Sequence, residues 1–130
     1  MKILTCVISD KKGRVIMNFK SHFDRFKRFQ SFCEENKKVV YLEFANRIEK
    51  YGPSGLPSES VSRYLAGRPL GTAVADPELT RIIIADSYKE NAVQFLLLEW
   101  NGADWQSGGA AEQKEAVLWL TGSSLVRQAA

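Results

Sequence analysis

Two apolar blocks in the second half of the chain constrain the fold more than any other feature. They occupy residues 81–85 and 92–100, with the polar segment DSYKEN between them and Asn101-Gly102 after them. This pattern favours two strands joined by a turn, because Asn-Gly is a strong hairpin signal. One long buried helix fits the same residues, since Asn-Gly also ends helices well. Both interpretations of residues 79–100 stay open.

Length and composition indicate a globular protein. The chain has 130 residues, of which 45% are hydrophobic, so we expect one compact domain over residues 1–122 and a frayed tail at 123–130. No apolar run approaches the ~20 residues that cross a bilayer. The segment MKILTCVISDKKG has a charged turn where a signal peptide would need a cleavage site. We therefore expect a soluble, cytoplasmic protein that does not enter a membrane.

The charges are unevenly divided along the chain. Residues 1–68 contain 14 Lys/Arg and 7 Asp/Glu, a net charge of +7, whereas residues 69–130 contain 4 and 8, a net charge of −4. A basic half suggests an anionic partner, and an acidic half suggests a partner protein or a second copy in a homodimer. An unevenly charged but merely solvated surface explains the same numbers.

The N-terminal segment predicts a β-hairpin followed by an amphipathic helix. Residues 2–8 and 14–20 are rich in β-formers and flank the turn segment SDKKG. A helix with Ser21 as its N-cap follows. At 100° per residue, one stripe of this helix faces the core and comprises His22, Phe23, Phe26, Phe29 and Cys33. Arg25 and Phe32 meet at the edge of the stripe, where a guanidinium can lie over a ring.

Helix signals dominate the middle and the end of the chain. Residues 39–43 have strand composition and lead into a helix through about residue 51, and a second helix begins at Pro57 and ends at Gly67. GTAVAD is interpreted as a loop before a helix capped by Asp76, and QSGGA at 106–110 as a flexible break before a helix at 111–122. The expected fold is α+β: an N-terminal β-hairpin plus amphipathic helix, with a mainly helical middle and C-terminus.

Catalytic and metal chemistry find little support in the sequence. The chain has two cysteines and one histidine, in no CxxC or Cys/His cluster, while a structural zinc site needs four ligands. The only candidate catalytic residues are Cys6 paired with His22, or Cys33 alone, and no nucleophile elbow is present. We expect a non-enzymatic protein without cofactor or metal.

The segment SESVSRYLAGR, residues 58–68, has the parts of a DNA-reading helix. Val61 and Leu65 can pack inward with Tyr64 beside them, while serines and Arg63 reach bases or phosphates. The segment resembles the recognition helix of lambda-repressor-like helix-turn-helix regulators, and FANRI at 44–48 resembles the preceding helix. The resemblance covers residues 41–85, although GPSGLPS is longer than the tight turn of that family.

These features support two functional hypotheses. The first is a regulatory or accessory protein that binds nucleic acid, with duplex DNA as the expected target, through Ser58, Ser60, Ser62, Arg63, Arg68, Lys27 and Arg28. The second is a small modulator or inhibitor that binds another protein through its acidic C-terminal third. The residues expected to make that contact are Trp100, Trp105 and Trp119, because tryptophan is enriched at binding hot spots.

Overall fold

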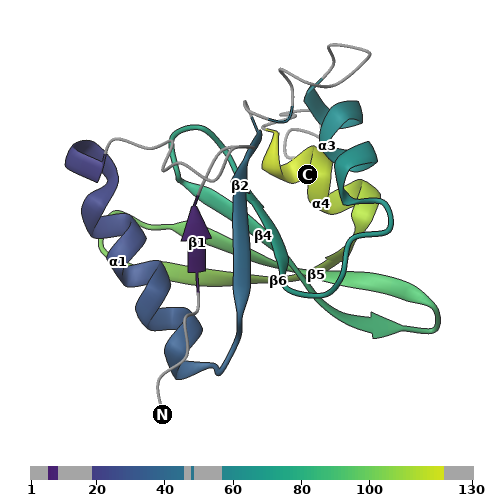
Figure 1. The fold of residues 1–130 in the computed structure, drawn as a ribbon, viewed down its shortest axis with the longest axis horizontal. Helices are drawn as coiled ribbons and strands as arrows, with labels where there is room; N and C mark the ends of the chain where they lie inside the picture. Colours follow the sequence, from purple (N-terminus) through teal and green to yellow (C-terminus); the bar gives the residue numbers. More distant parts are fainter. Residues whose placement is uncertain (1–5, 9–18, 46–47, 49–56, 122–130) are drawn as a thin grey trace.

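The protein is built on one six-stranded mixed sheet with helices on both faces (Figure 1). The computed structural model describes residues 6–8, 19–45, 48 and 57–121. The strands are β1 (Cys6–Ile8), β2 (Val40–Phe44), β3 (Thr72–Ala75), β4 (Arg81–Lys89), β5 (Ala92–Trp100) and β6 (Trp105–Glu112). The helices are α1 (Phe19–Glu35), α3 (Pro57–Leu65) and α4 (Gln113–Leu120).

The strands lie in the sheet in the order in which they occur in the chain. β1, β2 and β3 are parallel, whereas β3, β4, β5 and β6 form an antiparallel meander. Parallel neighbours need a crossover connection. Accordingly, α1 lies between β1 and β2 in the chain, and α3 lies between β2 and β3.

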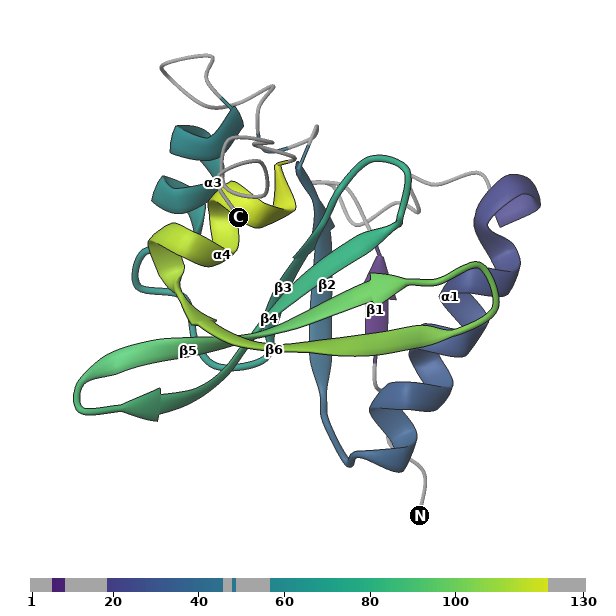
Figure 2. The same cartoon turned by 180° about the vertical axis from the view of Figure 1, so that it is seen from behind.

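Each face of the sheet has its own core. On the α1 side, Phe29 and Cys33 are fully buried against β2, β3 and β4. On the other side, Val61 of α3 and Val117 of α4 pack against β3, β4 and β5. Figure 2 shows α1 well separated from the pair formed by α3 and α4. No helix within the described ranges is long and apolar enough to cross a membrane.

The α1 prediction is correct for the inner part of the helix and wrong at its start. Phe29 and Cys33 are buried and Phe26 is partly buried, as the stripe predicts, but Phe23 is 53% exposed. The helix begins at Phe19 rather than after Ser21. The predicted hairpin strand 14–20 therefore ends in helix. Its remaining residues, and the side chain of His22, lie outside the described part of the chain.

The prediction of a mainly helical middle and C-terminus is wrong. The predicted loop GTAVAD contains β3, whose four residues are all buried, and the predicted break QSGGA lies within β6. The chain is still α+β, but the long meander from β3 to β6 supplies most of the second half. Short, fully buried strands lack the alternation that identifies a strand in sequence.

Asp76 caps a turn instead of a helix. Its Oδ1 accepts hydrogen bonds from the backbone N–H groups of Thr80, at 2.7 Å, and Arg81, at 2.8 Å. The predicted helix at Asp76-Pro77 is thus replaced by the β3–β4 turn, in which Leu79 has a φ of 57°. An aspartate can accept hydrogen bonds from nearby backbone N–H groups both at a helix N-terminus and in a turn. Asp76 in the sequence therefore did not distinguish a helix from a turn.

Residues 79–100 form a hairpin, the first of the two open interpretations. Its two-residue turn is Glu90-Asn91, with φ values of 52° and 74°, as a type I′ turn requires. β4 extends to Lys89, four residues beyond the predicted strand end. The predicted strand at 39–43 is confirmed as β2, and the predicted helices at 57–67 and 111–122 are confirmed as α3 and α4 with shorter bounds.

Candidate functional site

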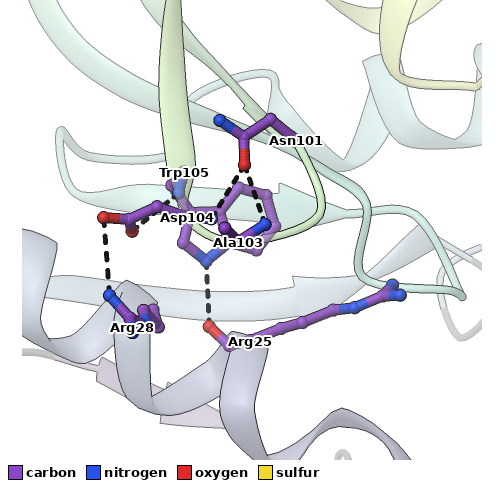
Figure 3. A network of polar contacts seen from close by, with 6 residues as sticks. All are labelled: Arg25, Arg28, Asn101, Ala103, Asp104 and Trp105. Atoms are coloured by element: carbon purple, nitrogen blue, oxygen red, sulfur yellow. Dashed lines mark hydrogen bonds and ion pairs between the residues drawn. The ribbon is translucent and has the colours of Figure 1, made fainter.

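Trp105, the first residue of β6, joins the β5–β6 turn to α1. It is 8% exposed, and its indole Nε1 donates a hydrogen bond of 2.9 Å to the backbone oxygen of Arg25 (Figure 3). Its ring meets Phe29 edge-on with centroids 6.2 Å apart, and Trp100 with centroids 5.3 Å apart. These contacts fix the β5–β6 turn against the helix.

The β5–β6 turn presents a carboxylate to the same helix. Asn101 Oδ1 accepts hydrogen bonds from the backbone N–H groups of Ala103 and Asp104, at 2.8 and 2.9 Å, which closes the turn. Asp104 then accepts from the N–H of Trp105 and lies 3.6 Å from the guanidinium of Arg28 (Figure 3). Both partners of this ion pair are more than half exposed, so it positions the turn but adds little stability.

A hollow of about 380 Å³ lies between α1 and this turn. We call it the α1–β6 hollow, and its lining residues are Asp24, Lys27, Arg28, Ser31, Phe32, Glu35, Asp104 and Trp105. Two aromatic side chains contribute its apolar lining, and two cations and three carboxylates its charged part. Lys27 and Arg28 were predicted to bind nucleic acid, and Trp105 was predicted to bind a partner protein. All three line this one hollow.

The side chain of Arg25 contacts both Trp100 and the β3–β4 turn. Its guanidinium lies 5.7 Å from the ring centroid of Trp100 and donates a 2.8 Å hydrogen bond to the backbone oxygen of Glu78. The sequence predicted that Arg25 would lie over Phe32, further along the same helix. The structure instead uses Arg25 to connect α1 to the β3–β4 turn and to β5.

Comparisons with known proteins give no relative from which a function could be transferred. No protein family, no curated protein and no solved structure matches this chain. A function for this chain is therefore inferred from the residues of the site and their surroundings.

Two of the three serines predicted to read DNA, Ser60 and Ser62, are turned toward the body of the protein. Ser60 is 2% exposed, and its hydroxyl has no hydrogen-bond partner among the described residues. Ser62 accepts a 2.8 Å hydrogen bond on Oγ and a 3.0 Å bond on its backbone oxygen, both from Gln113 Nε2 of α4. The side chain of Ser58 lies outside the described part of the chain.

Arg63 of α3 and Arg68, which follows the helix, differ in their surroundings. Arg63 is exposed. Arg68 donates from Nε to the backbone oxygen of Tyr64 at 2.9 Å and stacks 4.1 Å from the centroid of that ring. Val61 and Leu65 are buried and Tyr64 is partly buried, as predicted. α3 therefore packs beside α4 on the same face of the sheet, and a duplex along it would meet Arg63 but not Ser60.

Trp119 lies on the other face of the sheet from Trp100 and Trp105. The guanidinium of Arg81 lies 5.0 Å from its ring centroid and also donates a 2.7 Å hydrogen bond to its backbone oxygen. The structure thus brings together Lys27, Arg28, Trp100 and Trp105, and leaves Trp119 and the residues of α3 elsewhere.

Cys33, a candidate for chemistry, is buried in the α1-side core. Desolvation raises the pKa of its thiol to about 12, so it carries almost no thiolate near neutral pH. Among the described residues, no group of three or more His, Cys, Asp and Glu side chains could hold a metal ion.

Sequence reasoning missed Asp104 as a site residue. Asn101-Gly102 marked a turn, and a carboxylate two residues later was visible in the sequence. What was missing was the contact with Arg28, because the two residues are far apart in the chain and only the folded meander brings them together.

Proposed function

We propose that this chain is a non-enzymatic protein-binding module that holds a segment of another protein in the α1–β6 hollow. The observation that supports the proposal is the convergence of Lys27, Arg28 and Trp105 on one surface depression. Arginine and aromatic side chains are the types enriched in such recognition sites. This refines the protein-modulator hypothesis by placing recognition at one end of β6 rather than across all three tryptophans.

The charges of the hollow favour a peptide over a polyanion. Lys27 and Arg28 stand among the carboxylates of Asp24, Glu35 and Asp104. A nucleic-acid backbone would have to approach all three carboxylates, which costs electrostatic free energy. A peptide can instead place an apolar side chain on Phe32 and Trp105 and match the mixed charges around them.

The proposal is tested with peptides selected from a displayed random library on the purified protein. Arg28→Glu reverses the charge at the rim of the hollow, and we expect it to weaken selected peptides by about tenfold or more, as loss of a hot-spot arginine does. Lys114→Glu is the matched control, because Lys114 is an exposed cation on α4 and does not line the hollow. Peptides that bind both variants as tightly as wild type would contradict the proposal.

Nucleic-acid binding, the first hypothesis from the sequence, is the competing candidate. Exposed Arg63 on α3 favours it, together with exposed Lys27 and Arg28 on α1. These cations occur on two helices that lie apart at opposite faces of the sheet (Figure 2). A duplex would therefore use one group or the other, with few phosphate contacts and a shallow dependence on salt.

A further inference from the structure

β6 is an edge strand of the sheet, and its exposed middle part is uncharged. It pairs with β5 on one side, and no strand of the described chain pairs with its other side (Figure 2). Residues 106–110 are all exposed, and residues 106–111 include no charged residue and no proline. Natural proteins usually protect such an edge with charged residues, proline or a bulge, because free N–H and C=O groups accept another strand.

A bulge does occur in β6, and it changes which side chains share a face. Leu98 pairs with Ser107 and Leu97 pairs with Gly109, so Gly108 is an extra residue. Residues opposite each other in an antiparallel pair project from the same face of the sheet. The faces of β6 can therefore be assigned from the β5 residues that pair with it.

The α1 side of β6 carries residues from both ends of the strand. Trp105 belongs to the α1-side core, and the α1-side residues Leu98 and Leu96 of β5 pair with Ser107 and Ala110. By alternation Glu112 projects from this side as well. The opposite side carries Gln106, Gly109 and Ala111, since Leu97 and Ala111 pack against the α3–α4 core.

This arrangement makes β6 complementary to itself. In an antiparallel pair centred between Gly108 and Gly109, Trp105 lies opposite Glu112, Gln106 opposite Ala111, and Ser107 opposite Ala110. Each pair then shares a face, as pairing requires. Without the extra residue, Trp105 and Glu112 would project from opposite faces, because they are seven positions apart. We propose that two copies of this chain pair through β6 in a two-fold symmetric dimer, with one sheet continuous across both.

Charge and exposed apolar surface fit the same pairing. The α1 faces of both copies lie on one side of the joined sheet, so Glu112 of the second copy approaches the end of β6 where Arg28 lies beside Asp104. Leu96 and Leu97 are only partly buried, since the residues opposite them on β6 are alanine and glycine. A second β6 strand would cover more of Leu96 and Leu97 on the two faces of the sheet. Two-fold pairing also limits the assembly to a dimer.

The dimer is tested by sedimentation equilibrium of the full chain between about 1 and 200 µM, since a dimer population depends on concentration. We expect wild type to dimerise and Ala110→Lys to raise the dissociation constant at least about tenfold, because edge lysines block strand pairing and each dimer contains two. Ser87→Lys, at an exposed position of β4, is the control and should behave as wild type. Circular dichroism verifies that both variants are folded.

A charge swap tests the register. Glu112→Arg should weaken the dimer by placing two cations together, and the double variant Arg28→Glu with Glu112→Arg should restore it. The proposal is overturned if wild type stays monomeric at all concentrations, or if Ala110→Lys and Ser87→Lys give equal dissociation constants. Failure of the double variant to recover would overturn the pairing centred on Gly108 and Gly109.

Discussion

Trp105→Ala is expected to lower the free energy of unfolding by about 3–5 kcal/mol, as removal of a buried aromatic ring does. The substitution leaves a cavity beside Phe29 and Trp100 and removes the hydrogen bond to the Arg25 backbone oxygen. Urea denaturation followed by circular dichroism measures the change. The sequence alone assigned Trp105 to a partner contact, whereas its burial also gives it a role in the core.

Trp119 provides a comparison for peptide binding, because it does not line the α1–β6 hollow. It is partly buried and lies on the other face of the sheet, against Arg81. Trp119→Ala should leave peptide binding at the α1–β6 hollow within about twofold of wild type where the protein is folded, because distant sites act independently. A fully stable Trp105→Ala protein would contradict the core role of Trp105.

Gly71→Ala is expected to destabilise the protein by about 3–5 kcal/mol, through backbone strain and overpacking together. Gly71 has a φ of 97°, and an added Cβ would lie 2.7 Å from the backbone oxygen of Val39. Gly71 also connects β2 and β4, because its N–H donates to the backbone oxygen of Ala85 and its own oxygen accepts from the N–H of Tyr41. A shift of this backbone would disturb the junction between the parallel and antiparallel parts of the sheet.

Gly67→Ala is the matched control for this substitution. Gly67 has a φ of 77°, but an added Cβ there meets nothing within 4 Å. Gly67→Ala should lower the free energy of unfolding by only about 1–2 kcal/mol, the cost of placing alanine in a left-handed conformation. Equal unfolding free energies for the two variants would show that the contact with Val39 is unimportant.

Local patterns identified the elements that have one buried face. The helical stripe of α1, the start of α3 at Pro57, the strand β2 and the helix α4 were all predicted from periodicity, composition or cap residues. In each case the residues that pack are a few positions apart in the chain. Among the stripe residues whose side chains the structure describes, the prediction failed at Phe23, which is exposed.

The elements that were missed depend on partners distant in the chain. TAVA forms β3 because β2 and β4 lie on either side of it, although four small buried residues show no alternation. QSGGA forms part of β6 because β5 pairs with it, despite a composition typical of a flexible linker. The site depends on such contacts as well: Trp105 and the Arg25 oxygen that it binds are 80 positions apart.

The most direct test of the proposed function compares two labelled ligands on one preparation of the protein. Fluorescence anisotropy would follow a library-selected peptide and a DNA duplex at about 50 and 200 mM salt, across which multiple phosphate contacts change affinity by orders of magnitude. We predict that the peptide binds at both salt concentrations, that Arg28→Glu weakens it, and that the duplex binds weakly at 50 mM. Tight, steeply salt-dependent duplex binding without peptide binding would contradict the proposed function and support nucleic-acid binding instead.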